Sequence, residues 1–163
     1  MTTKQEMEAT LKEHCVPLLR GMGFKGSFPN LRREVDGFTS LINFQFFSSG
    51  DSFCVNLSYA GPNRENIGYC PDSELNKVTV SHTRDRVRLG AERGDRWFSF
   101  GPTSYGECRG APEPPAQIVA TIAELIRNHA EPWWTRKMED IRGSQQGAAP
   151  LPSAPAGPSE GAR

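Results

Sequence analysis

The sequence has neither the long apolar runs of membrane proteins nor the paired cysteines of secreted ones. No apolar stretch approaches the roughly 18 residues of a membrane-spanning helix, and segment 1–6 lacks the basic and then apolar order of a signal peptide. The four cysteines lie far apart and form no Cys-x-x-Cys pair, which favours free thiols in a reducing compartment. We therefore expect a cytoplasmic protein without a membrane segment.

Net charge and catalytic motifs are also missing. The formal net charge is zero, which disfavours nucleic acid as a partner because no overall field attracts it. The histidines His14, His82 and His129 have none of the short spacings that preorganise a zinc site. Phosphate-binding loops, dinucleotide fingerprints, nucleophile elbows and paired carboxylates are not evident. We expect no metal and no cofactor, and these absences favour a non-catalytic protein without excluding an enzyme.

Each end of the chain has an amphipathic helical pattern. In segment 3–20 apolar residues recur at helical spacing after a capping box that Thr3 forms with Glu6. Pro17 lacks an amide hydrogen and clashes with the preceding turn, so we expect a kink or break near His14.

A second helix is expected over 112–130. Pro132 is expected to interrupt it. Trp133 and Trp134 follow, and a last short helix would then close the core. From residue 143 onward the sequence is almost entirely Gly, Ala, Pro, Ser and Gln, which predicts a disordered tail over 143–163.

The middle of the chain alternates with the period of β-strands. Segments 38–47 and 53–59 each have one apolar and one polar face. The Ser- and Gly-rich link between them predicts an antiparallel hairpin that presents Asn43, Gln45 and Asn56 on one side. Further strands are expected at 31–35, 77–80, 84–89 and 96–100.

The most informative stretch is 84–90, in which three arginines alternate and would share one face of an extended strand: Arg84, Arg86 and Arg88. Val78 and Val80 have the same parity, so an uninterrupted strand would place valines and arginines together. We therefore expect a break within 81–83. It would turn the valines toward the core and leave the arginines on the polar face with the hairpin amides.

Taken together, these patterns predict an α+β domain over residues 1–142. Its antiparallel sheet of about five to six strands would have one face covered by the N-terminal and C-terminal helices. The disordered C-terminal tail, 143–163, would lie outside it.

Four short fragments resemble a family of mostly bacterial domains catalogued as domain of unknown function 4304. The fragments are Gly23-Phe24-Lys25, Ile42-Asn43-Phe44-Gln45, Arg86-Val87-Arg88-Leu89-Gly90 and Asp95-Arg96-Trp97-Phe98. The resemblance covers about residues 4–141 and implies a single α+β domain with no established activity. It supplies no catalytic residue. The positions that match the family's recurring residues are Asn43, Gln45, Arg86, Arg88, Asp95 and Trp97.

The candidate binding residues are the three arginines and the side chains expected near them: Arg84, Arg86, Arg88, Asn43, Gln45, Asn56, Asp95 and Trp97. Guanidinium groups on one face require anions. The simplest interpretation is structural, with Asp95 and other carboxylates pairing the arginines, the amides satisfied within the sheet and Trp97 packed.

Two functional interpretations remain open beside the structural one. One is a non-catalytic interaction module whose arginine-bearing face binds an acidic protein partner. The other is a site, possibly enzymatic, for a small anionic ligand that carries a phosphate or carboxylate. Both require two guanidinium groups to converge on one concave spot, with the amides of Asn43, Gln45 or Asn56 nearby.

Overall fold

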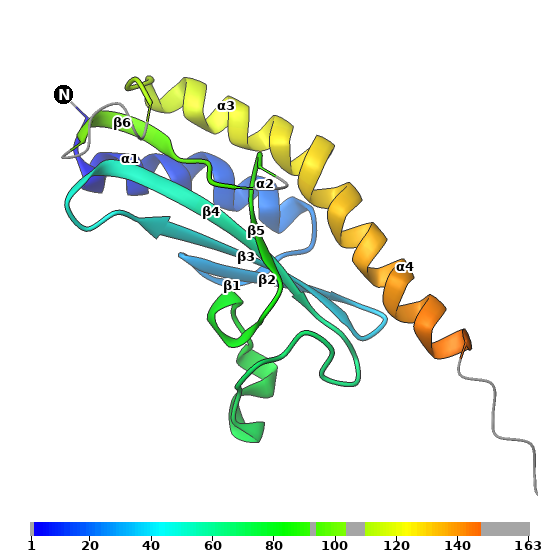
Figure 1. Ribbon diagram of the computed structural model, residues 1–163. Helices are drawn as coiled ribbons and strands as arrows, with labels where there is room; N and C mark the ends of the chain where they lie inside the picture. Colours follow the sequence, from blue (N-terminus) through cyan, green and yellow to red (C-terminus); the bar gives the residue numbers. More distant parts are fainter. Residues whose placement is uncertain (1, 92–93, 104–109, 148–163) are drawn as a thin grey trace, which may run out of the picture.

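The computed structural model describes residues 2–91, 94–103 and 110–147. Within them, an antiparallel six-stranded sheet has helices on one side (Figure 1). The helices are α1 (Lys4–Thr10), α2 (Val16–Gly21), α3 (Pro115–Leu125) and α4 (Glu131–Gly147). The strands are β1 (Lys25–Ser27), β2 (Asn30–Val35), β3 (Phe38–Phe46), β4 (Gly50–Ala60), β5 (Arg86–Arg88) and β6 (Phe98–Thr103). The predicted α+β fold class is confirmed.

Strand β4 is the centre of the sheet topology. The strand order is β1-β2-β3-β4-β5, and β6 also pairs with β4. Strands β3 and β4 form the predicted hairpin, in register from Thr39 opposite Ala60 to Phe46 opposite Phe53. β5 pairs with the middle of β4 and β6 with its beginning. The last two strands of the chain therefore lie at the same edge, beside different parts of β4.

The N-terminal helical segment begins where the sequence predicts, and its hydrogen-bond pattern changes around His14, where a kink or break is expected. The Oγ1 of Thr3 accepts from the Glu6 amide at 3.1 Å, and Glu6 Oε2 accepts from the Thr3 amide at 2.7 Å. A π-helical turn over Leu11–Cys15 separates α1 from α2. Its last bond runs from the Val16 amide to the Leu11 carbonyl, just before Pro17. The wider turn accommodates the proline ring without ending the helix.

The C-terminal helices use the same arrangement, and here the predicted interruption is wrong. A π-helical turn over Ile126–Ala130 joins α3 to α4, with the Glu131 amide donating to the Ile126 carbonyl directly before Pro132. The chain therefore stays helical through the proline. Residues 143–147 of the predicted tail belong to α4, and 148–163 lie outside the described residues. None of the described helices is both long and apolar enough to span a membrane.

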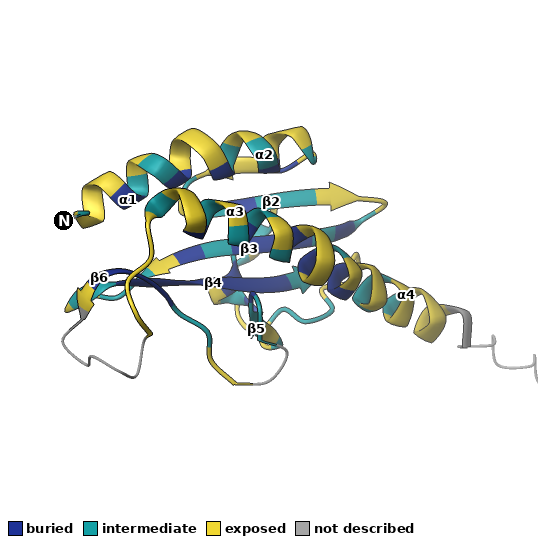
Figure 2. Cartoon of the chain, turned by 90° about the horizontal axis from the view of Figure 1, so that it is seen from above, coloured by how far each residue is buried: buried dark blue, intermediate teal, exposed yellow. Residues whose placement is uncertain are grey.

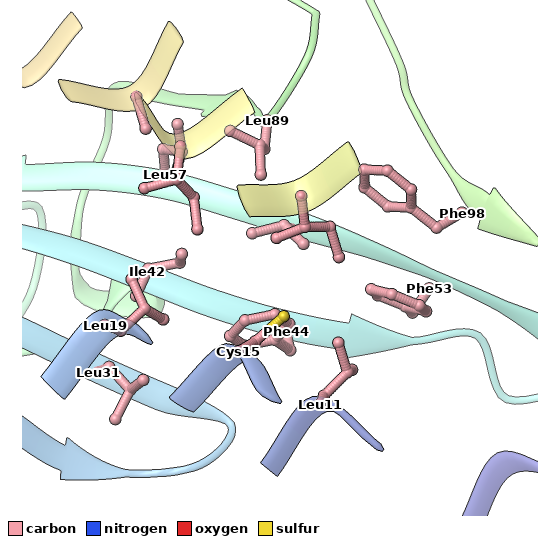
Figure 3. Packing of buried hydrophobic residues seen from close by; sticks show 14 of the residues in the cluster. Leu11, Cys15, Leu19, Leu31, Ile42, Phe44, Phe53, Leu57, Leu89 and Phe98 are labelled. Carbon is pink, nitrogen blue, oxygen red and sulfur yellow. The ribbon is translucent and has the colours of Figure 1, made fainter. Parts of the chain in front are cut away.

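The main core lies between the helices and the apolar face of the sheet. Figure 3 shows Leu11, Cys15 and Leu19 of the N-terminal helices packed toward Ile42 and Phe44 of β3. Burying each large apolar side chain contributes roughly 1.5–3 kcal/mol. In Figure 2 the buried positions lie where strands and helices face each other, and exposed positions line the outer helix surfaces.

Trp134 closes this core, as the sequence predicts. Its side chain is 2% exposed, and its Nε1 donates to the Ser58 carbonyl at 2.8 Å. The bond links α4 to β4.

The region between β4 and β5 differs from the predicted strands. Segment 77–80 does not form a strand, because 3₁₀ turns occupy Asp72–Lys77 and Val80–His82 and leave only two residues between them. β5 is limited to Arg86–Arg88, and the strand expected at 96–100 begins at Phe98. The predicted break before the arginines is present as the second 3₁₀ turn.

The expected direction of the valines is wrong. Val78 and Val80 pack against Leu41 and Ala60 in a second small cluster. By the strand alternation of β3, Leu41 lies on the face opposite the helices. Leu41 is a large apolar residue on a mostly polar face, and the valines remove it from water. Figure 1 shows this green segment on the side of the sheet away from the helices.

Candidate functional site

A row of polar residues crosses the sheet on the face away from the helices, which we call the open face. The strand register aligns one residue from each of five strands: Ser27, Asn30, Asn43, Asn56 and Arg88. Its three amides, Asn30, Asn43 and Asn56, are the asparagine row. The predicted common side of Asn43, Gln45 and Asn56 is confirmed by the hairpin register and by the bonds among them.

The hydrogen bonds of the asparagine row all run in one direction. Asn43 Nδ2 donates to Asn30 Oδ1 at 2.8 Å, and Asn56 Nδ2 donates to Asn43 Oδ1 and to Gln45 Oε1, each at 3.0 Å. The amide nitrogens of Asn30 and Gln45 have no acceptor among the described residues. The row therefore satisfies its own acceptors and leaves donors available at Asn30 and Gln45.

Arg88 is held firmly against this row. Its Nη1 donates to Asn56 Oδ1, to Cys54 Sγ and, at 3.4 Å, to Gln45 Oε1. Its guanidinium thus satisfies the amide and thiol acceptors that strands β3 and β4 place side by side. Arg88 therefore holds side chains of the open face together in addition to carrying a positive charge.

Asp95 and Trp97 hold the other side of the Arg88 guanidinium. Asp95 Oδ1 lies 3.1 Å from Arg88 Nε, and the centre of the guanidinium lies 5.4 Å from the Trp97 ring. Trp97 Nε1 donates to Asp95 Oδ2 at 2.7 Å. The predicted pairing of this arginine with Asp95 is therefore present, and the carboxylate offsets the Arg88 charge.

The other two arginines of the run are placed differently. Arg86 is exposed and has no ionic partner in the described part of the chain. Arg84 precedes β5, and its side chain runs beside Gly68, where a Cβ would lie 3.2 Å from Arg84 Cγ. The three arginines therefore do not act as one group, and Arg86 carries the uncompensated charge beside Arg88.

A hollow of about 290 Å³ lies between these two arginines, and we call it the β5 hollow. It is lined by Gln45, Asn56, Arg86, Val87, Arg88, Ala91 and Gly94. Among the predicted site residues, Gln45, Asn56, Arg86 and Arg88 meet here. Asn43 accepts a hydrogen bond from Asn56, and Asp95 and Trp97 contact Arg88. Arg84 does not line the hollow.

A second hollow on the open face was missed by the sequence analysis. We call it the β1 hollow; it measures about 330 Å³ and is lined by Gly26, Ser27, Asn30, Leu31, Arg32, Lys77, Val78 and Thr79. The alternation of β2 indicates that Arg32 lies on the face opposite Leu31. The position of Lys77 had no such signal, because a 3₁₀ turn replaces the expected strand.

The cysteines are buried wherever the structure describes them. Cys15, Cys54 and Cys70 are free thiols, as predicted, and Cys108 lies outside the described residues. Burial raises the pKa of Cys15 to about 12, so this thiol stays protonated and is a poor nucleophile. Within the described ranges, no three His, Cys, Asp or Glu side chains form a group that could hold a metal ion.

The comparisons with known proteins concern this same part of the chain. A family described as domain of unknown function DUF4304 matches residues 15–136. No curated protein and no solved structure matches the chain. The matched span contains the asparagine row and the residues that line both hollows.

Proposed function

We propose that this chain, which belongs to the domain-of-unknown-function family DUF4304, is a non-catalytic interaction module of the bacterial cytoplasm that binds an acidic protein partner. The observation that carries the proposal is the exposure of Arg86. Its side chain is an exposed guanidinium without an ionic partner among the described residues, and it shares the β5 hollow with Arg88. Arg86 is the primary contact with the partner, and Arg88 lines the hollow beside it.

The polarity of the β5 hollow supports an anionic partner. The available groups around it are donors: the guanidinium of Arg86 and the amide nitrogen of Gln45. Asn56 uses its oxygen to accept from Arg88, and Asp95 is occupied by Arg88 and Trp97. A surface that offers donors and a net positive charge favours carboxylate oxygens on its partner.

The polar lining of the β5 hollow supports a protein partner rather than an enclosed metabolite. Sites for small molecules are concave and mostly apolar, with a few polar groups. Here the lining of the β5 hollow is dominated by charged and amide side chains, with Val87 and Ala91 as its apolar members. Such a lining resembles the polar parts of a protein interface, where arginine is enriched.

A small anionic ligand is the second candidate, and its support is the volume of the hollow. About 290 Å³ lies near the lower limit of small-molecule sites. The guanidinium of Arg86 and the amide nitrogen of Gln45 are donors that fit a phosphate or a carboxylate. This candidate predicts a rise in melting temperature with inorganic phosphate or citrate that depends on Arg86.

The experiment is an NMR titration of ¹⁵N-labelled protein with a hexaglutamate peptide. We expect shifts at the Gln45 side-chain amide and at the backbone of Arg86 and Arg88, and we expect Arg86→Glu to remove them. Arg84→Glu is the matched control, because it makes the same charge change outside the hollow. Equal loss of binding in both variants, or no loss with Arg86→Glu, would overturn the proposal.

A further inference from the structure

Arg32 and Arg86 occupy the same cross-strand row of the sheet. The register places Arg32 opposite Leu41, Leu41 opposite Ser58, and Ser58 opposite Arg86. The two arginines therefore lie on the open face with three strand spacings between them. At about 4.8 Å per spacing, their backbones are about 14 Å apart.

The centre of that row is covered. Leu41 is 1% exposed beneath Val78 and Val80, and the Ser58 hydroxyl lies 2.6 Å from the Thr83 hydroxyl. Segment 78–83 therefore forms a ridge across the row. The β1 hollow and the β5 hollow lie on its two sides. The asparagine row runs alongside it from Asn30 to Asn56, and Arg88 lies next to Asn56.

The β1 hollow is cationic. Arg32 and Lys77 line it, and no carboxylate does. Neither cation has an ionic partner in the part of the chain that the structure describes. Glu34 follows two positions after Arg32 on the same strand face, but it does not line the hollow. This end of the open face therefore carries a net positive charge of its own.

The backbone that forms the wall of the β1 hollow is fixed in place. Gly26 has φ of 104°, and a Cβ there would lie 2.9 Å from the Asn30 carbonyl oxygen, so a side chain would be strained. From the helix side, Arg20 Nη2 donates to the Gly26 carbonyl at 2.6 Å. The hollow is therefore bounded by a braced edge strand, and the amide nitrogen of Asn30 is available as a donor inside it.

We infer that the β1 hollow is a second carboxylate site, and that one extended acidic segment of the protein partner occupies both hollows. The inference rests on the proposed function and deepens it. A separation of about 14 Å corresponds to about four residues of extended chain. Residues i and i+4 of a strand point to the same side. Carboxylates at i and i+4 would reach Arg86 in one hollow and Arg32 with Lys77 in the other.

The groups between the hollows suit a peptide better than a nucleic acid. The asparagine row is uncharged, and the amide nitrogens of Asn30 and Gln45 can donate to backbone carbonyls of the bound segment. Nucleic-acid phosphates form a continuous line of charge that requires a continuous line of cations. The charges here are instead concentrated at two points.

The test uses two blocked peptides with the full-length protein. The first, acetyl-Glu-Ser-Gly-Ser-Glu-amide, carries carboxylates at i and i+4, and the second replaces the last Glu with Gln. We expect the first peptide to bind about tenfold more tightly, because the second contact is intramolecular once the first has formed. Arg32→Glu should remove this gain and leave the weaker binding of the second peptide unchanged.

Two further variants keep the result interpretable. Lys77→Gln should reduce the gain without reversing a charge, and it serves if Arg32→Glu does not fold. Arg84→Glu should leave the gain intact. An unchanged gain in both Arg32→Glu and Lys77→Gln would overturn the second site, while Arg86-dependent binding of the single-Glu peptide would still support the proposed function.

The remaining outcomes separate the two proposals. If neither peptide shifts any resonance around Arg86 or Arg32, the proposed function fails together with this inference. If a ten-residue oligothymidylate binds more tightly than the two-carboxylate peptide at physiological salt, the acidic segment is the wrong occupant and this inference is overturned.

Discussion

The Nε of Arg88 lies 3.1 Å from the Oδ1 of Asp95, and this pairing separates the roles of two arginines that look equivalent in the sequence. Arg88 is also bonded to the acceptors of Gln45, Cys54 and Asn56. Arg86, two residues earlier on the same strand face, is exposed. A charge reversal at both positions would therefore mix a structural effect with a binding effect.

Arg88→Ala should lower the free energy of unfolding by about 2 kcal/mol, because it leaves the acceptors of Asn56 and Gln45 without their charged donor. Arg86→Ala should change it by less than about 0.5 kcal/mol, as is usual for an exposed side chain. Urea unfolding followed by circular dichroism measures both. Equal effects of the two substitutions would contradict the separation of roles.

Asn43→Ala should destabilise the protein by about 1–2 kcal/mol, because Asn43 both donates to Asn30 and accepts from Asn56. Thr39→Ala is the control, since Thr39 lies on the same face of β3 but outside the asparagine row. If the two variants unfold at the same urea concentration, the asparagine row has no role in stability.

The β3–β4 hairpin could be predicted from the sequence because one long pairing obeys one period. The alternation of Phe38 to Phe46 against Phe53 to Tyr59 requires only that apolar residues share a face. The resulting register places Asn43 opposite Asn56. The predicted meeting of the amides with Arg88 followed from the same alternation, extended to β5.

Three features could not be predicted from the alternation of the strands. Val78 and Val80 leave the main core because a 3₁₀ turn uncouples side-chain direction from strand parity. The helix continues past Pro132 because a π-helical turn precedes the proline. The difference between Arg86 and Arg88 depends on Asp95, which reaches the sheet through tertiary contact. The first two features are local backbone turns that residue periodicity does not encode, and the third is a side-chain contact outside the strand.

Trp134→Phe should lower the free energy of unfolding by about 1–3 kcal/mol. The substitution keeps most of the apolar contact in the core, but it removes the buried hydrogen bond that Trp134 Nε1 donates to the Ser58 carbonyl. Differential scanning calorimetry measures the loss. Phe98→Leu, a change of apolar shape without a lost hydrogen bond, is the comparison, and a loss that is no larger for Trp134→Phe would contradict a role for this bond.

Cys15 should make the protein progressively less stable in alkaline solution. Burial raises the pKa of its thiol from 9.0 to about 12, so between these two values the unfolded chain has lost the proton that the folded chain keeps. The folded state then binds more protons than the unfolded state, and the free energy of unfolding falls as pH rises. The contribution of this thiol is a loss of about 1.4 kcal/mol per pH unit in that window.

Lys137 and Tyr59 also lower the stability in alkaline solution, and they determine the control for the measurement. The pKa of Lys137 is raised, chiefly by its hydrogen bond to Asp85, and burial raises the pKa of Tyr59. For both, the folded state also retains protons longer, so stability is lost above pH about 10 even without Cys15. Cys15→Ala should therefore flatten the decline between pH 9 and 10 and leave a shallower decline above pH 10, which Lys137 and Tyr59 cause. Urea unfolding at intervals of half a pH unit distinguishes the two ranges, and an identical decline in wild type and Cys15→Ala would show that the thiol does not contribute.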